Sequence, residues 1–121
     1  MNLKVEVNKL NNVALIRLAS NFFTSSAMAK NLKAELDALF SNNQYSVIVN
    51  LEEVTSIDSE ALGILAYGFK NCRSKNGMFI LCNICNQDVK DVLDIVNLSS
   101  VIPIFDTEYE ALEHINRAHH E

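Results

Sequence analysis

A polar stretch in the middle of the chain holds the residues best placed for chemistry. It runs from Thr55 to Gly63 and contains Asp58, Ser59 and Glu60 in succession. We expect it to join a buried strand to a helix, and in open α/β sheets functional groups collect where strands end and helices begin. Asp58 or Ser59 can cap that helix, and the positive end of the helix dipole favours Glu60 in the first turn. Capping alone would explain these residues, and nothing in their pattern indicates a catalysed reaction. We therefore treat the stretch as a candidate contact site.

A second candidate is the C-x-x-C pair formed by Cys82 and Cys85. We expect it at a strand-to-helix junction, where thiol–disulfide enzymes hold their reactive thiol because a helix N-terminus lowers its pKa. The aromatic-Cys-Gly-Pro context of such enzymes is absent. Cys72 falls on the apolar face of a predicted helix, where a free cysteine packs like a small hydrophobic residue. Because three cysteines are an odd number, we do not expect a disulfide framework. A thiol oxidoreductase therefore stays only a lower alternative.

Other catalytic patterns are missing from the sequence. His114, His119 and His120 all fall in or after the last predicted helix, and the five-residue spacing of the first two does not place them on one helical face. Neither a G-x-G-x-x-G loop nor a Walker A motif is present. No Ser or Cys has an identifiable base. We therefore expect no metal ion, no cofactor and no enzymatic activity.

The hydrophobic periodicity predicts an α/β fold with the element order β-β-α-β-α-β-α-β-α. Alternating or β-branched runs predict strands at residues 3–7, 13–18, 45–51, 78–82 and 101–105. Helical spacing predicts helices that carry apolar stripes within residues 28–40, 61–72, 89–96 and 112–115. The first two strands form an antiparallel hairpin and the later strands are parallel. Asn76-Gly77 closes the second helix, with Gly77 as the expected C-terminal cap. The expected result is a single domain over residues 1–121, with helices packed on a mixed sheet.

The composition and charge of the chain limit the kinds of partner that we expect it to bind. The chain has 121 residues, 49% of them hydrophobic and 21% charged, with a formal net charge of −5. No cluster of Lys and Arg could track phosphates, so we expect no nucleic-acid partner. The longest apolar stretch, residues 61–69, is too short to span a bilayer, and no signal peptide is recognisable. We expect a cytoplasmic protein without direct membrane insertion.

Residues 50–63 carry a family resemblance. Their sequence, Asn-Leu-Glu-Glu-Val-Thr-Ser-Ile-Asp-Ser-Glu-Ala-Leu-Gly, resembles the STAS domain signature of the anti-sigma factor antagonists, roughly Asp-Leu-x-x-Val-x-x-Ile-Asp-Ser-Ser-Gly-Leu-Gly. The opening hairpin, residues 77–82 and residues 98–112 extend the resemblance over nearly the whole chain. It implies a STAS-like fold and a partner switch in which the antagonist binds a kinase-type anti-sigma factor and so frees a sigma factor. The kinase ends this binding by phosphorylating the second hydroxyl residue after the Asp, which adds negative charge to the interface.

The chain departs from the family pattern at informative positions. Glu60 occupies the phospho-acceptor position, with Ser59 before it and Ala61 in place of Gly. A carboxylate cannot be phosphorylated by that route, and it matches a phosphate in sign though not in full charge. Phe23 stands where family members often have an Asp after the second strand, and Asn50 replaces an Asp at the end of the third.

The resemblance leads to a first hypothesis of a non-enzymatic regulator in a partner-switching pathway of transcription. Its partner would be a GHKL-type kinase anti-sigma factor. Asp58 would shape the loop, Ser59 would lie at the contact and Glu60 would set its charge, with Ala61 and Phe23 as neighbouring contact residues. Ser59 is the hydroxyl left for phosphorylation, and we expect it to stay largely unmodified. The alternative is an accessory subunit of an ABC-type lipid transporter, a role that some STAS domains without a phospho-acceptor take.

Overall fold

The computed structural model describes residues 13–18 and 26–119, and the side chains of residues 29–118 within the second range. The predicted first strand, its hairpin turn and Phe23 lie outside the described residues. Strands and helices alternate along the described chain, as the hydrophobic pattern predicts. Within this part of the chain, no helix is both long enough and apolar enough to cross a membrane.

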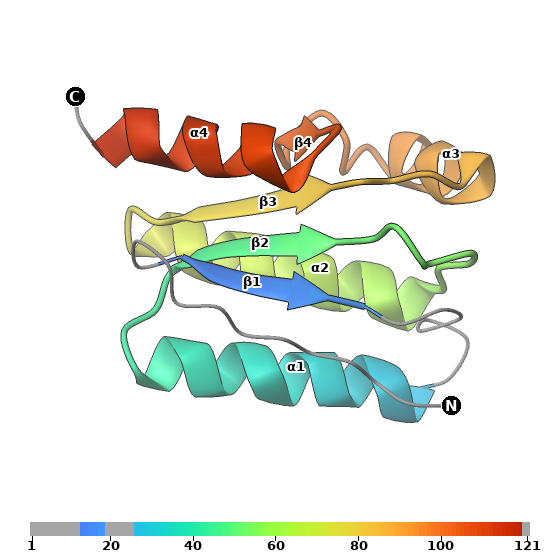
Figure 1. Cartoon of the computed structure of the whole chain (residues 1–121). Helices are drawn as coiled ribbons and strands as arrows, with labels where there is room; N and C mark the ends of the chain where they lie inside the picture. Colours follow the sequence, from blue (N-terminus) through green and yellow to red (C-terminus); the bar gives the residue numbers. More distant parts are fainter. Residues whose placement is uncertain (1–12, 19–25, 120–121) are drawn as a thin grey trace.

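The described strands form one parallel sheet in the order β1-β2-β3-β4 (Figure 1). Their bounds are Ala14–Arg17, Ser46–Asn50, Met78–Cys82 and Ile104–Phe105. The register pairs Arg17 with Asn50 and Asn50 with Cys82, so the carboxyl ends of the first three strands lie level with one another. Helical crossovers connect these strands, and parallel pairing needs such connections.

Helices cover both faces of the sheet (Figure 1). The helices are α1 (Ser26–Ser41), α2 (Ser59–Ser74), α3 (Gln87–Ile95) and α4 (Glu108–His119). Buried residues of α1, α2 and α3 share the main core with one face of the sheet. Ala111 and Ile115 of α4 pack against the opposite face, in a smaller core.

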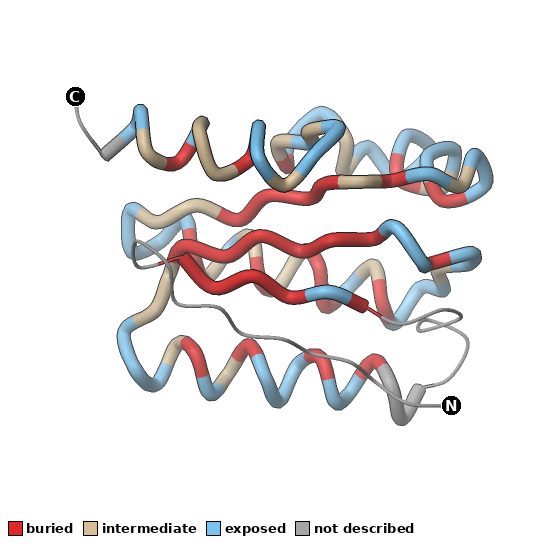
Figure 2. Tube along the Cα trace, in the orientation of Figure 1, coloured by how far each residue is buried: buried red, intermediate tan, exposed pale blue. Residues whose placement is uncertain are grey.

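The central strands are buried on both faces (Figure 2). In β2, Val47 and Val49 face the main core, whereas Ile48 faces α4. Phe79 and Ile80 show the same alternation in β3. Successive side chains of a strand point to opposite faces, so a strand covered on both sides needs apolar residues throughout. The sequence prediction of buried central strands is confirmed.

The end of α2 corrects one prediction. Asn76, rather than Gly77, takes the left-handed conformation after the helix, with a φ of 60°. The Gly77 N–H then donates to the Cys72 carbonyl at 2.8 Å, which closes a Schellman motif. Glycine is needed at position 77 for another reason: a Cβ there would lie 2.0 Å from the backbone oxygen of Tyr45. Glycine is therefore required at position 77 because the loop that contains Tyr45 comes close to its backbone, and not because this position needs a positive φ.

The last strand is shorter than predicted. Residues 101–103 are not in β4, because the N–H groups of Val101 and Ile102 donate back to the Leu98 carbonyl at 3.0 and 2.8 Å. These turn hydrogen bonds compete with a strand ladder, so the strand begins at Ile104. β4 lies at one end of the described strand order, which agrees with the edge position that Pro103 favours.

Candidate functional site

The start of α2 is built by the cap that the sequence predicts. Asp58 has extended backbone angles, and its Oδ1 accepts a hydrogen bond from the Ala61 N–H at 2.8 Å. The Asp58 carbonyl also accepts from the Leu62 N–H at 3.0 Å. The side-chain bond satisfies a backbone donor that has no partner within the helix, and the carbonyl bond is the first hydrogen bond of the helix itself, so α2 begins directly after Asp58.

Asp58 fixes which residues of the first turn face outward. Ser59 and Glu60 begin the helix, and both side chains are exposed. Ala61 has an exposed fraction of 0% and packs in the main core, so its side chain does not reach the surface. Of the residues that the sequence predicts at a partner contact, the structure therefore brings Asp58, Ser59 and Glu60 together on the outside of the fold.

Gly63 continues this outward face and was not singled out as a contact residue by the sequence reasoning. It lies three residues after Glu60 and four after Ser59, which is the spacing of neighbours on one helical face. Gly63 is exposed, and a Cβ at this position would meet no described atom within 4 Å. A glycine inside a helix is destabilising by about 1 kcal/mol relative to alanine, and no contact of the described fold requires one here. A glycine on an exposed helical face is the signal that could have found it.

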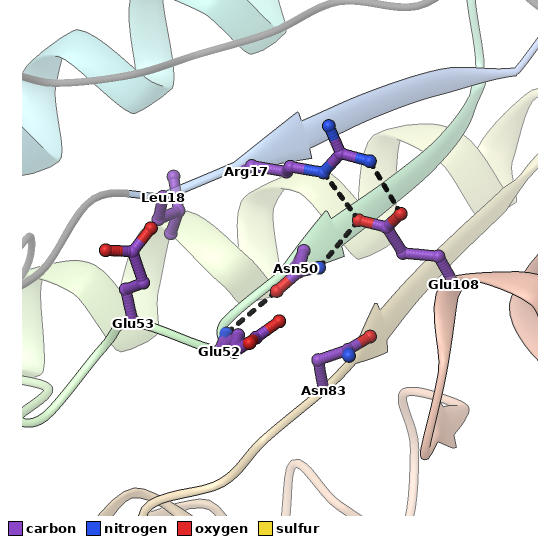
Figure 3. Close-up of a pocket in the computed structure, with 7 residues that line it drawn as sticks. All are labelled: Arg17, Leu18, Asn50, Glu52, Glu53, Asn83 and Glu108. Atoms are coloured by element: carbon purple, nitrogen blue, oxygen red, sulfur yellow. Dashed lines mark hydrogen bonds and ion pairs between the residues drawn. The ribbon is translucent and has the colours of Figure 1, made fainter.

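A second polar cluster lies where the parallel strands end (Figure 3). Arg17 at the end of β1 donates to both carboxylate oxygens of Glu108, each at 2.8 Å. Asn50 at the end of β2 donates through Nδ2 to Glu108 Oε2 at 2.6 Å. The Glu108 carboxylate thus joins two strand ends to the first turn of α4, which Thr107 caps by accepting from the Glu110 N–H at 3.1 Å.

The cluster explains why an amide suits position 50. Asn50 is buried, with an exposed fraction of 6%, and its Oδ1 also accepts from the Glu52 N–H at 2.8 Å. An Asp here could accept from Glu52 but could not donate to Glu108, and it would bring two carboxylates together. The hydrogen bonds from Arg17 hold the pKa of Glu108 below its ordinary value, against the opposing effect of burial and with further help from Asn50. Glu108 therefore stays charged at neutral pH.

The cysteines show no geometry for thiol chemistry. Cys82 ends β3 and is buried, and this burial raises the pKa of its thiol to about 12. Cys85 lies beyond the strand, exposed to solvent, and both thiols are free. Burial likewise raises the pKa of Cys72 to about 12. The pair lies at the junction of β3 and α3, as the sequence predicts, but a buried thiol of high pKa such as that of Cys82 is a poor nucleophile.

No metal-binding cluster occurs in the part of the chain that the structure describes. There, no group of three or more His, Cys, Asp or Glu side chains is arranged to hold a metal ion. The arrangement at α2 supplies a capped helix start with exposed polar residues and no nucleophile–base pair. Chemically, it can take part in recognition between surfaces.

The fold and this site together define an α/β domain with a helix start presented for recognition, and comparisons identify its class. Residues 4–111 match the model of the STAS domain. A candidate anti-sigma factor antagonist of Thermotoga maritima is 37% identical over 79 residues, which are 64% of this chain and 69% of that protein. The anti-sigma F factor antagonist of Paenibacillus polymyxa is 26% identical over 113 residues, 93% of this chain and 94% of the relative.

A solved structure agrees with these relatives. The crystal structure of a candidate anti-sigma factor antagonist from Thermotoga maritima superposes with a TM-score of 0.83 at 25% identity, covering 94% of each chain. The chain belongs to the STAS domain family. Within that family it is similar to the anti-sigma factor antagonists.

Proposed function

We propose that this chain is a non-enzymatic regulator that binds a protein partner through the exposed start of α2. The partner class that the resemblance implies is a GHKL-type kinase that acts as an anti-sigma factor in a partner-switching pathway of transcription. The single observation that carries the proposal is the outward face formed by Ser59, Glu60 and Gly63 behind the Asp58 cap. Relatives named as anti-sigma factor antagonists support this function over the transporter alternative.

Glu60 gives this chain a permanent negative charge at the position where the family pattern has a phospho-acceptor. Its carboxylate stands at the acceptor position, exposed, in the first turn of α2. If the partner had kept the surface that meets a serine, a permanent negative charge would hold the two proteins apart. A domain locked in that state would have no evident use, so we infer that a basic group of an adapted partner meets Glu60. A charge-assisted hydrogen bond would then form at this point.

Gly63 supports the same face as a contact. An exposed glycine leaves the helix backbone uncovered, so a partner's chain can approach α2 closely beside Ser59 and Glu60. The glycine is unfavourable for the helix, and none of the described neighbours occupies the space above it. A contact with another molecule gives this residue a function that the isolated fold does not.

The test is calorimetric titration of the chain into GHKL-type kinases encoded in the same genome, at fixed salt. We expect one of them to bind, Glu60→Ser to weaken that binding by about 1–2 kcal/mol, and Gly63→Gln to weaken it as well. Glu35→Ser is the matched control, because Glu35 is exposed on α1 and the substitution is identical. Stronger binding by Glu60→Ser would show that Glu60 imitates phosphate. Unchanged binding by both α2 variants would remove α2 from the interface.

A further inference from the structure

The turn that ends α2 contains the single Asn-Gly sequence of the chain, Asn76-Gly77. An asparagine loses its side-chain amide most readily before a glycine, because no Cβ of the next residue hinders attack by the backbone nitrogen. Asn76 is exposed, so water can reach its side chain. The pair is therefore a site of spontaneous chemical modification unless the fold prevents the reaction.

The reaction begins when the backbone nitrogen of Gly77 attacks Cγ of the Asn76 side chain. A C–N bond forms, and the side-chain nitrogen leaves as ammonia, taking the proton of the Gly77 N–H, so that the residue becomes a cyclic imide. Water then opens the ring at either carbonyl carbon. One opening gives an aspartate in normal linkage, and the other gives an isoaspartate, whose main chain runs through the side-chain carbons. Overall, water is consumed and ammonia is released.

The folded end of α2 holds the two reacting atoms apart. Asn76 has a φ of 60°. In the left-handed conformation to which this angle belongs, the next backbone nitrogen lies roughly opposite Cβ across the bond between Cα and the carbonyl carbon. Closing the imide ring needs that nitrogen and Cβ on the same side of this bond. The Asn76 side chain therefore cannot present Cγ to the Gly77 nitrogen until the peptide between the two residues rotates.

Contacts on both sides of Gly77 oppose this rotation. The Gly77 N–H donates to the Cys72 carbonyl at 2.8 Å, within the last turn of α2. On the other side, the Met78 N–H donates to the Tyr45 carbonyl at 2.9 Å, and a Cβ on Gly77 would lie 2.0 Å from that same oxygen. The nitrogen that must attack is thus a bonded donor, packed between the end of α2 and the residue that precedes β2.

We propose that Asn76 is a conformationally gated modification site, which is inert in the folded chain and forms isoaspartate once the end of α2 opens. The opening that permits the reaction breaks the hydrogen bond from Gly77 to Cys72. Isoaspartate lengthens the main chain at this turn, and the backbone of Gly77 already lies against Tyr45, which leaves no room for a longer segment. The product therefore keeps the end of α2 from closing again. This site is separate from the exposed start of α2 and does not depend on the function proposed for it.

The test compares the folded chain with the chain unfolded in guanidinium chloride, at the same alkaline pH and temperature. Peptide mass spectrometry follows the replacement of the Asn76 amide by a carboxyl group, and an isoaspartate-specific carboxyl methyltransferase detects the isoaspartate. We expect the unfolded chain to react at least about tenfold faster, because the folded chain reacts only while the end of α2 is open. A smaller ratio of the two rates would overturn the proposal.

Two controls separate the effect of the fold from those of the denaturant and the sequence. A synthetic peptide of residues 73–81 contains Asn76-Gly77 without the fold, so it should react as fast as the unfolded chain, with or without denaturant. A peptide that reacts as slowly as the folded chain would show that the fold does not protect Asn76. In the unfolded chain, Asn83 precedes the branched Ile84 and should stay largely unmodified. Equal reaction of Asn83 and Asn76 would refute the role of the glycine.

Hydrogen exchange followed by NMR tests whether the product stays open. In the folded parent the Gly77 amide should exchange slowly, because it donates to Cys72. In the isoaspartate form, separated by ion exchange and returned to buffer, the same amide should exchange at least about tenfold faster. Asn76→Gly is the matched control: it lacks the reactive amide, glycine adopts a positive φ readily, and slow exchange should persist after the same treatment. Equal protection of Gly77 in the parent and the isoaspartate form would refute the claim that the turn stays open.

Discussion

Replacing glycine by alanine should change the stability of the protein in opposite directions at the two glycines of α2. Gly63 and Gly68 lie five residues apart in the same helix, and neither has a positive φ. A Cβ at Gly63 would meet nothing within 4 Å, so Gly63→Ala changes only the conformational freedom of the backbone. Alanine is favoured over glycine in a helix by about 1 kcal/mol. For a chain of this length, that corresponds to a rise in melting temperature of roughly 4 °C.

The same change at Gly68 should destabilise the protein. A Cβ there would lie 2.5 Å from Phe79 Cε1 and 2.9 Å from Phe79 Cζ. Phe79 has an exposed fraction of 1% and sits in the main core, so its ring cannot move away without disturbing other side chains. Overpacking of this kind costs typically about 1–3 kcal/mol, which exceeds the gain in helix propensity.

The assay is chemical denaturation of the three proteins, followed by circular dichroism, with the unfolding slopes compared to confirm a common mechanism. We expect a higher midpoint for Gly63→Ala and a lower midpoint for Gly68→Ala. A loss of stability in Gly63→Ala would show that the space above this residue is occupied. The inference that Gly63 serves a contact outside the fold would then fail. Equal effects of the two substitutions would refute the packing argument as a whole.

Three further predictions follow from the site. Glu108→Gln should lose about 1 kcal/mol of stability at pH 7, because a partly exposed bidentate ion pair is lost. The lowered pKa of Glu108 means that this contribution is present above the ordinary value of 4.5 and is lost as pH falls through the folded value, so denaturation curves of variant and wild type should converge in acid. In the native protein, Cys85 should react with a thiol reagent while the two buried cysteines react only after unfolding, and rapid labelling of all three would contradict their burial. Intact-mass spectrometry after incubation with a binding kinase and ATP should show a largely unmodified chain. One phosphate mapped to Ser59 would refute the inference that Glu60 permanently replaces the phospho-acceptor.

Local features of the fold were open to prediction because they depend on neighbours in the sequence. The Asp58 cap involves an N–H only three residues away, and Thr107 caps α4 in the same manner. Strand burial follows from the composition of short runs, and the parallel arrangement follows from the helices between the strands. The exposed Ser59 and Glu60 follow from the same local geometry, since the cap fixes the phase of the helix.

The amino-acid sequence by itself therefore determined the order of the elements, the start of α2 and the family resemblance. Only the tertiary structure decided that Arg17, Asn50 and Glu108, separated by up to 91 positions, share one set of hydrogen bonds. It also decided that Gly77 is required by the backbone of Tyr45. Local preferences operate over a few residues and leave a trace in spacing, whereas these contacts exist only once the parallel strands have aligned their ends. No periodicity encodes which distant side chains then meet.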